Sequence, residues 1–402
     1  MPIGDIESLD HEGRGITRLN GKTVFVEGAL PGERVEYASF RSKPSYEIAS
    51  TLTVLAASPA RVTPPCPHYG VCGGCSLQHC DPLAQVAAKQ RLLEANLWHL
   101  SRLKAEVLYA PIYGEAWGYR HRARLSVRYV PGKGGVLIGF HEKKSSYIAD
   151  MRQCAILPPA LSALLPALHA LVGQLSIRER LPQIELAVGE RLTALVLRIL
   201  APLSSADRRL LGEFADRHAV AIYQQPQGPA SARRLHPAEA PSLTYALPEY
   251  AVEFAFSPTE FTQVNPPINQ LLVRRAMTLL APQAGERIAD LFCGLGNFAL
   301  PLARAGAHVV GIEGSGELVT RAKANAQANA LAERSDFRVA DLFTVTAADV
   351  AAWGSFDKML IDPPREGAVA LIKSLDARNA PRRLLYVSCN PATLARDAGI
   401  LV

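Results

Sequence analysis

Cys389, in the segment LLYVSCNPATLARD, is the residue whose type and position most favour a chemical role. The apolar residues before it predict a strand that ends at the cysteine. Asn390 is a favourable N-cap and Pro391 suits the first helical position, so the thiol should lie at a helix N-terminus. The positive end of a helix favours the thiolate, the nucleophilic form of cysteine. A buried structural cysteine is the alternative, and the position at a strand end favours the nucleophile.

A second motif, RIADLFCGLGNFALPLARAG, predicts a strand, a glycine turn and a helix. Gly294 and Gly296 would let the backbone turn sharply and approach a ligand closely. Glu313 ends the next predicted strand, where a carboxylate can bind both hydroxyls of a ribose. The third glycine of G-x-G-x-x-G is absent, which disfavours a dinucleotide. The motif therefore predicts a site for a nucleoside cofactor, with glycines needed only for packing as the alternative.

A third motif, IDPPREG, follows another predicted buried strand. Asp362 and two prolines would form a rigid loop, poor in hydrogen-bond donors, at the carboxyl edge of the sheet. Enzymes that methylate the amino groups of nucleic-acid bases have an aromatic residue after the two prolines. Arg365 occupies that position here, which argues against methylation of adenine or cytosine amino groups. A turn without a chemical role is the alternative.

These motifs together suit methylation of carbon 5 of a uracil, a reaction that needs a cysteine. Carbon 5 is a poor nucleophile, but addition of a thiolate to carbon 6 turns it into an enolate carbon that can take a methyl group. A base must then remove the carbon 5 proton so that the thiolate can leave. A base stacked in its helix has to be extruded before it can react.

The elements that would position these motifs follow Pro266. A predicted helix at 267–281 precedes strands that alternate with helices, which indicates a parallel, doubly wound α/β sheet. The predicted strands are 287–292, 308–312, 336–340, 357–361 and 384–388.

Upstream of the predicted sheet, the chain is rich in β-structure signals. Asn20-Gly21 between apolar runs predicts a type I′ hairpin, and residues 1–55 predict a small β-barrel, with a hairpin extension of the next domain as the alternative. Strands predominate again at 117–260, with a hairpin across Gly189-Glu190 and a helix at 204–218. We therefore expect three domains: 1–55, 56–260 and 261–402.

Seven cysteines, four of them within fifteen residues, favour metal ligation or catalysis over disulfides. Cys66, Cys72 and Cys75 form C-x5-C-x2-C, with Cys80 and Cys154 as candidate fourth ligands. Thiolates suit zinc or an iron–sulfur cluster, and the spacing does not choose between them. It differs from the C-x3-C-x2-C of radical enzymes. Unligated structural thiols are the alternative.

The cysteine segment at 56–80 has too few large apolar residues to form a hydrophobic core, so a bound metal would have to stabilise its fold. The amphipathic helix predicted at 82–104 would pack on the catalytic domain.

The segment GYRHRARLSVRYV predicts a strand with a basic face. Arginines occupy alternate positions on this face, and apolar side chains occupy the other face. The arginines are Arg120, Arg122, Arg124 and Arg128. Because they cannot neutralise each other, we expect them to meet RNA phosphates, with a solvated face as the alternative.

The composition is typical of a globular protein, with 49% hydrophobic and 20% charged residues in 402. Lys and Arg outnumber Asp and Glu by 43 to 37, which is compatible with a polyanionic partner. No apolar run reaches the length of a membrane span, and the acidic N-terminus is unlike a signal peptide. We expect a cytoplasmic monomer with no membrane attachment.

The cysteine string, the glycine turn, IDPPREG and VSCNPATLARD resemble the RNA (uracil-5-)-methyltransferase family over nearly the whole chain. The barrel resembles a TRAM domain, and a TRAM domain with a cysteine cluster is typical of the branch that modifies 23S ribosomal RNA. The resemblance implies an enzyme that uses S-adenosyl-L-methionine and methylates a uridine of the uracil-1939 type, with Cys389 as its catalytic nucleophile. It also implies a [4Fe–4S] cluster with Cys66, Cys72, Cys75 and Cys154 as ligands.

The resemblance also implies the other site residues. The cofactor positions would be Gln263, Phe292, Gly294, Asn297, Glu313, Asp341 and Asp362, of which Asp341 is the least uniform within the family. Phe261 would lie close to the target base, and Arg365 would contact RNA.

Two rival functions stay open: a transfer-RNA (uracil-5-)-methyltransferase, and a non-catalytic RNA-binding protein that retains the fold. A function as an iron–sulfur electron carrier is disfavoured, because it would give the cofactor-binding domain no role. The chain ends at Val402, within the helix after Cys389. Doubly wound methyltransferases usually add two strands there, and the family carries a proton-removing Glu in that segment. We expect from this a truncated chain with slow turnover.

Overall fold

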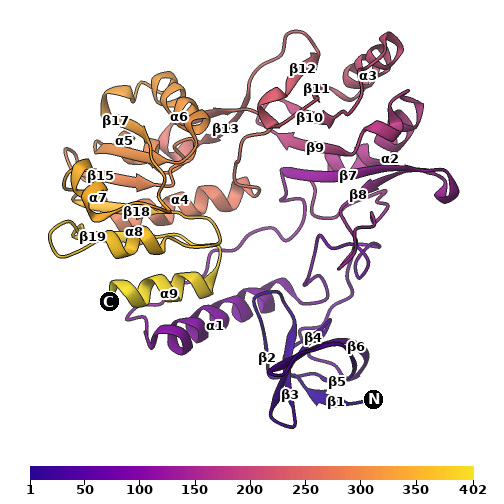
Figure 1. Ribbon diagram of the computed structural model, residues 1–402, viewed down its shortest axis with the longest axis horizontal. Helices are drawn as coiled ribbons and strands as arrows, with labels where there is room; N and C mark the ends of the chain where they lie inside the picture. Colours follow the sequence, from indigo (N-terminus) through magenta and orange to yellow (C-terminus); the bar gives the residue numbers. More distant parts are fainter. The chain divides into compact units, whose positions relative to one another are not determined.

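The computed structural model describes residues 1–402, apart from the side chain of Lys133. The chain divides into two compact units (Figure 1). The first consists of Met1–Tyr113 and Phe140–Ala149, and the second of Gly114–Gly139 and Asp150–Val402. The division into three domains expected from the sequence stays a prediction. None of the described helices is long and apolar enough to cross a membrane.

The first unit begins with a six-stranded sheet in the order β1-β5-β6-β4-β3-β2. Its strands are β1 (Ile3–Asp5), β2 (Ser8–Leu9), β3 (Gly15–Leu19), β4 (Lys22–Glu27), β5 (Arg34–Ser42) and β6 (Tyr46–Ala56). Asn20 and Gly21 have φ values of 53° and 81° between the antiparallel β3 and β4, which confirms the predicted hairpin. A Cβ on Gly4 would lie 2.8 Å from Thr17 Oγ1, so β1 closely approaches β3. The sheet therefore curls into the predicted barrel.

The barrel is followed by residues 57–81, which form neither helix nor strand, and by helix α1 (Pro82–Ser101). Asp81 caps α1, accepting hydrogen bonds from the backbone N–H groups of Leu83 and Ala84. The helix predicted at 82–104 is thus confirmed, ending three residues earlier than expected.

The second unit contains a mixed sheet in the order β12-β11-β10-β9-β7-β8. Its strands are β7 (Arg122–Val130), β8 (Gly135–Gly139), β9 (Gln183–Val188), β10 (Thr193–Arg198), β11 (Val220–Gln225) and β12 (Arg233–His236). Helices α2 (Pro159–Gln174) and α3 (Ser205–His218) accompany it. The hairpin predicted across Gly189-Glu190 joins the antiparallel β9 and β10, and α3 matches the helix predicted at 204–218.

The same unit contains a five-stranded, wholly parallel sheet in the order β17-β16-β15-β18-β19. Its strands are β15 (Arg287–Leu291), β16 (His308–Glu313), β17 (Ser335–Val339), β18 (Lys358–Ile361) and β19 (Arg383–Tyr386). All five lie where the sequence predicted strands. The order reverses between β15 and β18, and ligands of such sheets bind at the carboxyl ends beside that reversal.

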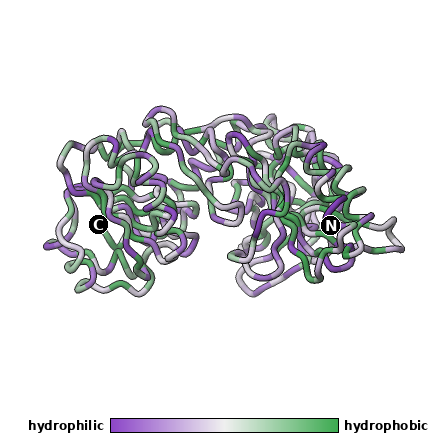
Figure 2. The backbone as a smooth tube through the Cα atoms, turned by 90° about the horizontal axis from the view of Figure 1, so that it is seen from above, coloured by the Kyte–Doolittle hydropathy of each residue, from purple (hydrophilic) through white to green (hydrophobic). Residues whose placement is uncertain are grey.

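Helices cover both faces of this parallel sheet, which confirms the doubly wound α/β prediction. The face formed by Ile288 and Val309 packs against α4 (Pro266–Leu280), α5 (Ala299–Arg304) and α6 (Gly316–Ala328). The face formed by Ala289 and Val310 packs against α7 (Ala347–Trp353) and α8 (Val369–Ser374). Figure 2, which colours the backbone by hydropathy, shows hydrophobic segments in green in the part of the chain around the C-terminus. A hairpin of β13 (Leu243–Leu247) and β14 (Val252–Phe256) precedes α4, and α9 (Pro391–Leu401) follows β19.

Candidate active site

The glycine turn follows β15 at the carboxyl edge of the parallel sheet. Phe292, Gly294 and Gly296 all have left-handed φ values, of 62°, 55° and 97°. Nothing lies within 4 Å of the position that a Cβ on Gly294 would occupy. The backbone is therefore open to a ligand that approaches the reversal point of the sheet.

Glu313, the last residue of β16, has its carboxylate fixed by two backbone donors. The N–H of Gly294 donates to Oε2 at 3.1 Å, and the N–H of Ser315 donates to Oε1 at 3.0 Å. Each oxygen keeps lone pairs for a further donor. A carboxylate held in this way, beside an open glycine turn, can accept both hydroxyls of a ribose.

Asp290, within β15, has a fully buried carboxyl group. The backbone N–H of Ala299 faces it without reaching hydrogen-bond geometry, and neither side-chain oxygen has a hydrogen-bond partner. Burial, and then the negative charge of Asp362, raise the pKa of Asp290 well above its usual range. A buried polar group without a partner is costly, so this one indicates a ligand or water at the strand end.

Asp362 follows β18, the strand next to β15, and its N–H donates to the carbonyl of Leu291 at 3.2 Å. Burial raises the pKa of Asp362 to about 6. A pKa of about 6 leaves Asp362 mostly ionised at neutral pH. Its negative charge beside the reversal point suits a positively charged ligand group.

Asp341 and two aromatic rings line the neighbouring strand ends. Asp341 lies after β17, is exposed, and accepts the N–H of Phe343 at 2.9 Å. The Phe343 ring packs edge-on against Phe292, with ring centroids 5.5 Å apart. Phe343 was not among the residues selected from the sequence, although its aromatic type two residues after Asp341 was a usable signal.

Asn297, at the end of the glycine turn, has its side chain engaged by the protein itself. Its Oδ1 accepts from Tyr245 Oη and from Asn269 Nδ2, both at 2.9 Å, and its Nδ2 donates to Asn269 Oδ1 at 2.9 Å. Tyr245 is on β13 and Asn269 is on α4. The side chain of Asn297 therefore fixes the turn to two other elements.

Cys389 is exposed and lies between β19 and α9. The Oδ1 of Asn390 accepts the N–H of Ala392 at 3.0 Å, which confirms the predicted N-cap. Pro391 begins the helix, also as predicted. The thiol is accessible and stands directly before the positive end of α9.

The IDPPREG loop is hydrogen-bonded to α9 and its N-cap through the carbonyl groups of Arg365 and Glu366. Asn390 Nδ2 and Thr393 Oγ1 both donate to the carbonyl of Arg365 at 3.2 Å. Arg396 donates to the carbonyl of Glu366 at 2.7 Å. The loop that begins at Asp362 and the helix that follows Cys389 thus form one connected structure.

Asp397, fully buried on α9, completes this connection. Its Oδ2 accepts from the N–H of Ala368 at 2.8 Å and from Tyr386 Oη at 2.6 Å, and its Oδ1 accepts from Arg396 at 2.8 Å. The sequence analysis did not select Asp397 as a site residue. Its signal would have been a carboxylate on the helix face that also carries the buried Ala395.

Phe261 and Gln263 lie in the loop between β14 and α4. The Phe261 side chain is 68% exposed, and Gln263 is half-buried. Both are therefore accessible from the surface of the second unit.

The basic strand β7 has the predicted alternation. Ala123, Leu125 and Val127 are buried, while Arg124 and Arg128 are exposed. Arg124 pairs with Glu185 at 3.0 Å. Arg122 instead donates to the carbonyl of Pro258 at 2.8 Å and approaches Thr262 Oγ1 at 3.5 Å. Arg120 precedes the strand and is half-buried.

Three of the predicted cluster ligands lie in the first unit. Burial, followed by nearby Cys75 and Cys66, raises the pKa of Cys72, which indicates that the three thiols are close together. The N–H of Gly74 donates to Cys72 Sγ at 3.4 Å. Cys154 is in the second unit. Within the described residues, no group of three or more His, Cys, Asp or Glu side chains is arranged as a metal site.

Comparison with known proteins gives two family matches. Residues 243–401 match the model described as tRNA (Uracil-5-)-methyltransferase, and residues 5–37 match the TRAM domain. The protein named 23S rRNA (uracil(1939)-C(5))-methyltransferase RlmD from Dechloromonas aromatica (strain RCB) is 61% identical over 402 residues, covering 100% of this chain and 93% of that protein. The chain belongs to the RNA (uracil-5-)-methyltransferase family.

A second relative of this RNA (uracil-5-)-methyltransferase is the protein named 23S rRNA (uracil(1939)-C(5))-methyltransferase RlmD from Burkholderia pseudomallei (strain K96243), which is 57% identical over 413 residues. That match covers 100% of this chain and 89% of the relative. Among solved structures, the Pyrococcus abyssi tRNA (uracil-54, C5)-methyltransferase in complex with S-adenosyl-L-homocysteine matches with a TM-score of 0.75 and 24% identity. It covers 99% of this chain and 92% of that one, which shows a shared fold.

Proposed function

We propose that this RNA (uracil-5-)-methyltransferase acts on 23S ribosomal RNA, transferring a methyl group from S-adenosyl-L-methionine to carbon 5 of a uridine. The target would be of the uracil-1939 type, as in the names of its relatives. The observation that carries the proposal is the accessible thiol of Cys389 at the start of α9, since that helix is hydrogen-bonded to the loop of Asp362.

The residues at the carboxyl edge fit S-adenosyl-L-methionine. The open turn at Gly294 offers space for the ligand, and the fixed carboxylate of Glu313 can bind the ribose. The carboxyl group of Asp290, which has no hydrogen-bond partner, offers a further polar contact. When bound, this cofactor supplies an electrophilic methyl group on a positively charged sulfur. We assign its binding to Gln263, Phe292, Gly294, Asn297, Glu313, Asp341 and Asp362, with Asn297 acting through the position of the turn.

The chemistry follows from Cys389. Its thiolate forms a bond to carbon 6 of the uracil, and the electrons of the 5,6 double bond move into the enolate. Carbon 5 then forms its bond to the methyl carbon, and the bond between that carbon and sulfur breaks. Transfer of the carbon 5 proton to a base restores the double bond, and the bond between carbon 6 and the Cys389 sulfur breaks to release the thiolate. Asp362, ionised at neutral pH, stabilises positive charge at this edge.

We assign RNA contacts to Phe261 at the target base and to Arg365 on the loop next to Cys389. The exposed Arg124 and Arg128 of β7, with Arg120 before it, would bind phosphates. Arg122, also predicted from the sequence to contact RNA, donates within the protein and would add positive charge only at a distance. The barrel matched as a TRAM domain would bind RNA as well.

We also propose a [4Fe–4S] cluster held by Cys66, Cys72, Cys75 and Cys154. The donors fit its chemistry, because thiolates are the ligands of such clusters and three of these cysteines lie in one segment without helix or strand. Anaerobically purified protein should contain about four irons, as expected of a four-cysteine cubane. Cys154→Ala should lose the iron and Cys80→Ala should keep it. One zinc without iron, or the reverse response of the two variants, would contradict this ligand set.

A transfer-RNA substrate is the second candidate, favoured by the description of the family model that matches residues 243–401. Mass spectrometry of RNA from cells that lack the gene decides between the two. We expect 5-methyluridine to disappear from one position of 23S ribosomal RNA and to stay unchanged in transfer RNA. Loss from transfer RNA alone would overturn the proposed substrate, and no loss from either would overturn the activity.

A further inference from the structure

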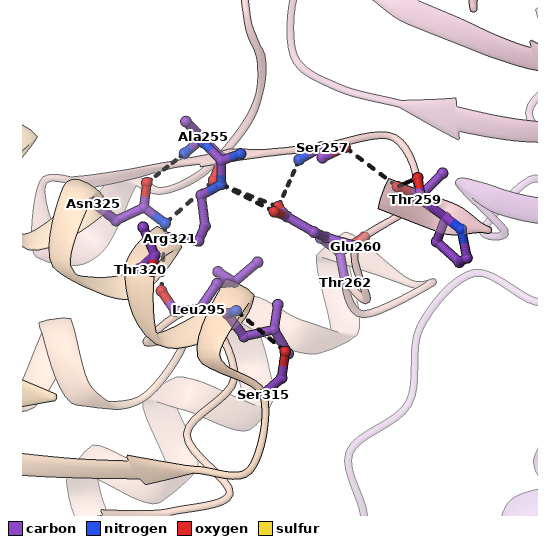
Figure 3. A network of polar contacts seen from close by, with 12 residues as sticks. Ala255, Ser257, Thr259, Glu260, Thr262, Leu295, Ser315, Thr320, Arg321 and Asn325 are labelled. Carbon is purple, nitrogen blue, oxygen red and sulfur yellow. Dashed lines mark hydrogen bonds and ion pairs between the residues drawn. The ribbon is translucent and has the colours of Figure 1, made fainter. Parts of the chain in front are cut away.

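The loop Ser257–Asn265, between β14 and α4, is held by polar contacts from several elements of the second unit. Figure 3 shows the network on one side of it. Pro258, Thr259, Glu260, Thr262 and Val264 each have a polar contact that anchors the loop. Phe261 and Gln263 lie between the anchors. The residues proposed to contact the base and the cofactor are therefore each flanked by fixed neighbours.

Glu260 is the anchor on the side of α6. Arg321 Nε lies 3.2 and 3.1 Å from the two oxygens of the Glu260 carboxylate. Glu260 Oε2 also accepts the N–H of Ser257 at 2.6 Å, and the N–H of Glu260 donates to the Ser257 carbonyl at 3.0 Å. The Glu260 side chain is only 14% exposed, so this ion pair is better shielded from water than most surface pairs.

The helix that carries Arg321 is itself fixed to β14. Asn325 accepts the N–H of Ala255 at 2.9 Å and donates to its carbonyl at 3.2 Å, as a neighbouring strand would. Asn325 also donates to the carbonyl of Leu295 in the glycine turn at 3.4 Å. Helix α6 begins just after Glu313, the proposed ribose ligand. The position of Arg321 is thus tied to the cofactor edge.

The other side of the loop is held from β7. Arg122 donates to the Pro258 carbonyl and approaches Thr262, and the N–H of His121 donates to the Val264 carbonyl at 2.8 Å. Arg122 is half-buried in this contact, and its guanidinium is engaged by the loop.

We propose that Glu260, Arg321 and Arg122 form a loop clamp that sets the positions of Phe261 and Gln263 for methyl transfer. The proposal rests on the function proposed above. These three are positioning residues, since none of them touches a reacting atom. Substitution of one of these three residues leaves the cofactor-binding residues at the sheet edge unchanged but lets the loop shift. A displacement of about 1 Å at a reacting centre can lower the rate about 100-fold.

The test uses Arg321→Met, Glu260→Gln and the double variant, with Arg274→Met as the matched control. Arg274 forms an ion pair with Glu249 at 2.6 Å, which is more exposed and does not involve the loop. Methyl transfer to 23S ribosomal RNA from cells lacking the gene should fall about 10- to 100-fold in Arg321→Met. The double variant should be no slower than the worse single variant, because the two residues act as one unit. Arg321→Lys should recover part of the rate.

A second measurement does not depend on activity. Chymotrypsin should cleave after the exposed Phe261 several times faster in Arg321→Met than in the wild type or Arg274→Met, while the melting temperatures of these three proteins stay within a few degrees of one another. Equal rates of methyl transfer and of cleavage in Arg321→Met and Arg274→Met would overturn the clamp. If the wild type does not methylate RNA, the proposed function fails, and the cleavage rates still decide the clamp.

Discussion

Asp362→Asn should stabilise the protein in the absence of cofactor, by an amount that grows with pH. Burial raises the pKa of Asp362 from an ordinary 3.8 to about 6. The folded state therefore holds this proton more tightly than the unfolded state. The resulting stability is fully present below about pH 4 and is lost as the pH rises through about 6. The gap between the two pKa values corresponds to about 3 kcal/mol of unfolding free energy.

Asparagine has almost the same shape and never ionises, so the variant avoids this loss. Calorimetry from about pH 4 to 7.5 should show the advantage of the variant over the wild type growing by about 3 kcal/mol, or about 6–12 °C in melting temperature for a domain of typical size. Asp336→Asn is the control, because it removes only a surface ion pair with Arg338. Wild-type and Asp362→Asn profiles that run parallel across this range would refute the reasoning.

Two further predictions concern the hydrogen bonds by which Asp397 fixes α9, and the basic strand β7. Asp397→Ala leaves the buried donors of Ala368 and Tyr386 without an acceptor, at a cost of about 2–6 kcal/mol. Hydrogen exchange of the Ala368 amide should accelerate at least about tenfold, with a smaller effect in Asp397→Asn. An unchanged exchange rate would contradict the role of Asp397 in holding this amide. Arg128→Ala should weaken binding to all RNAs similarly and reduce the salt dependence by about one ion, whereas Arg122→Ala should leave the salt dependence nearly unchanged. Equal salt effects in the two variants would contradict the separation of their roles.

Much of the fold follows from local sequence signals. Asn20-Gly21 fixes its hairpin because both residues must adopt a left-handed backbone, and the structure has them there. The central parallel strands β15, β16 and β18 were predictable because they are buried on both faces and appear as short apolar runs between helices. The cap of α9 was predictable because Asn390 and Pro391 act within a single helical turn.

The parts that the sequence did not reveal depend on contacts between distant residues. Alternation alone placed Arg122 on the same face as Arg124, but its partner is the carbonyl of Pro258, which no local pattern indicates. The network of Asn297 with Tyr245 and Asn269 likewise joins three elements. Asp290 escaped notice because its burial depends on the packing of neighbouring strands.

Covalent catalysis by Cys389 is the central claim, and one measurement tests it most directly. RNA that carries 5-fluorouridine at the target position is incubated with the protein and S-adenosyl-L-methionine, and the mixture is separated under denaturing conditions. Because fluorine cannot leave as a proton, the thiolate cannot be expelled, and a stable protein–RNA adduct should form. Mass spectrometry should locate the RNA on the peptide containing Cys389, and Cys389→Ala should form no adduct. An adduct of equal yield with Cys389→Ala would contradict the account.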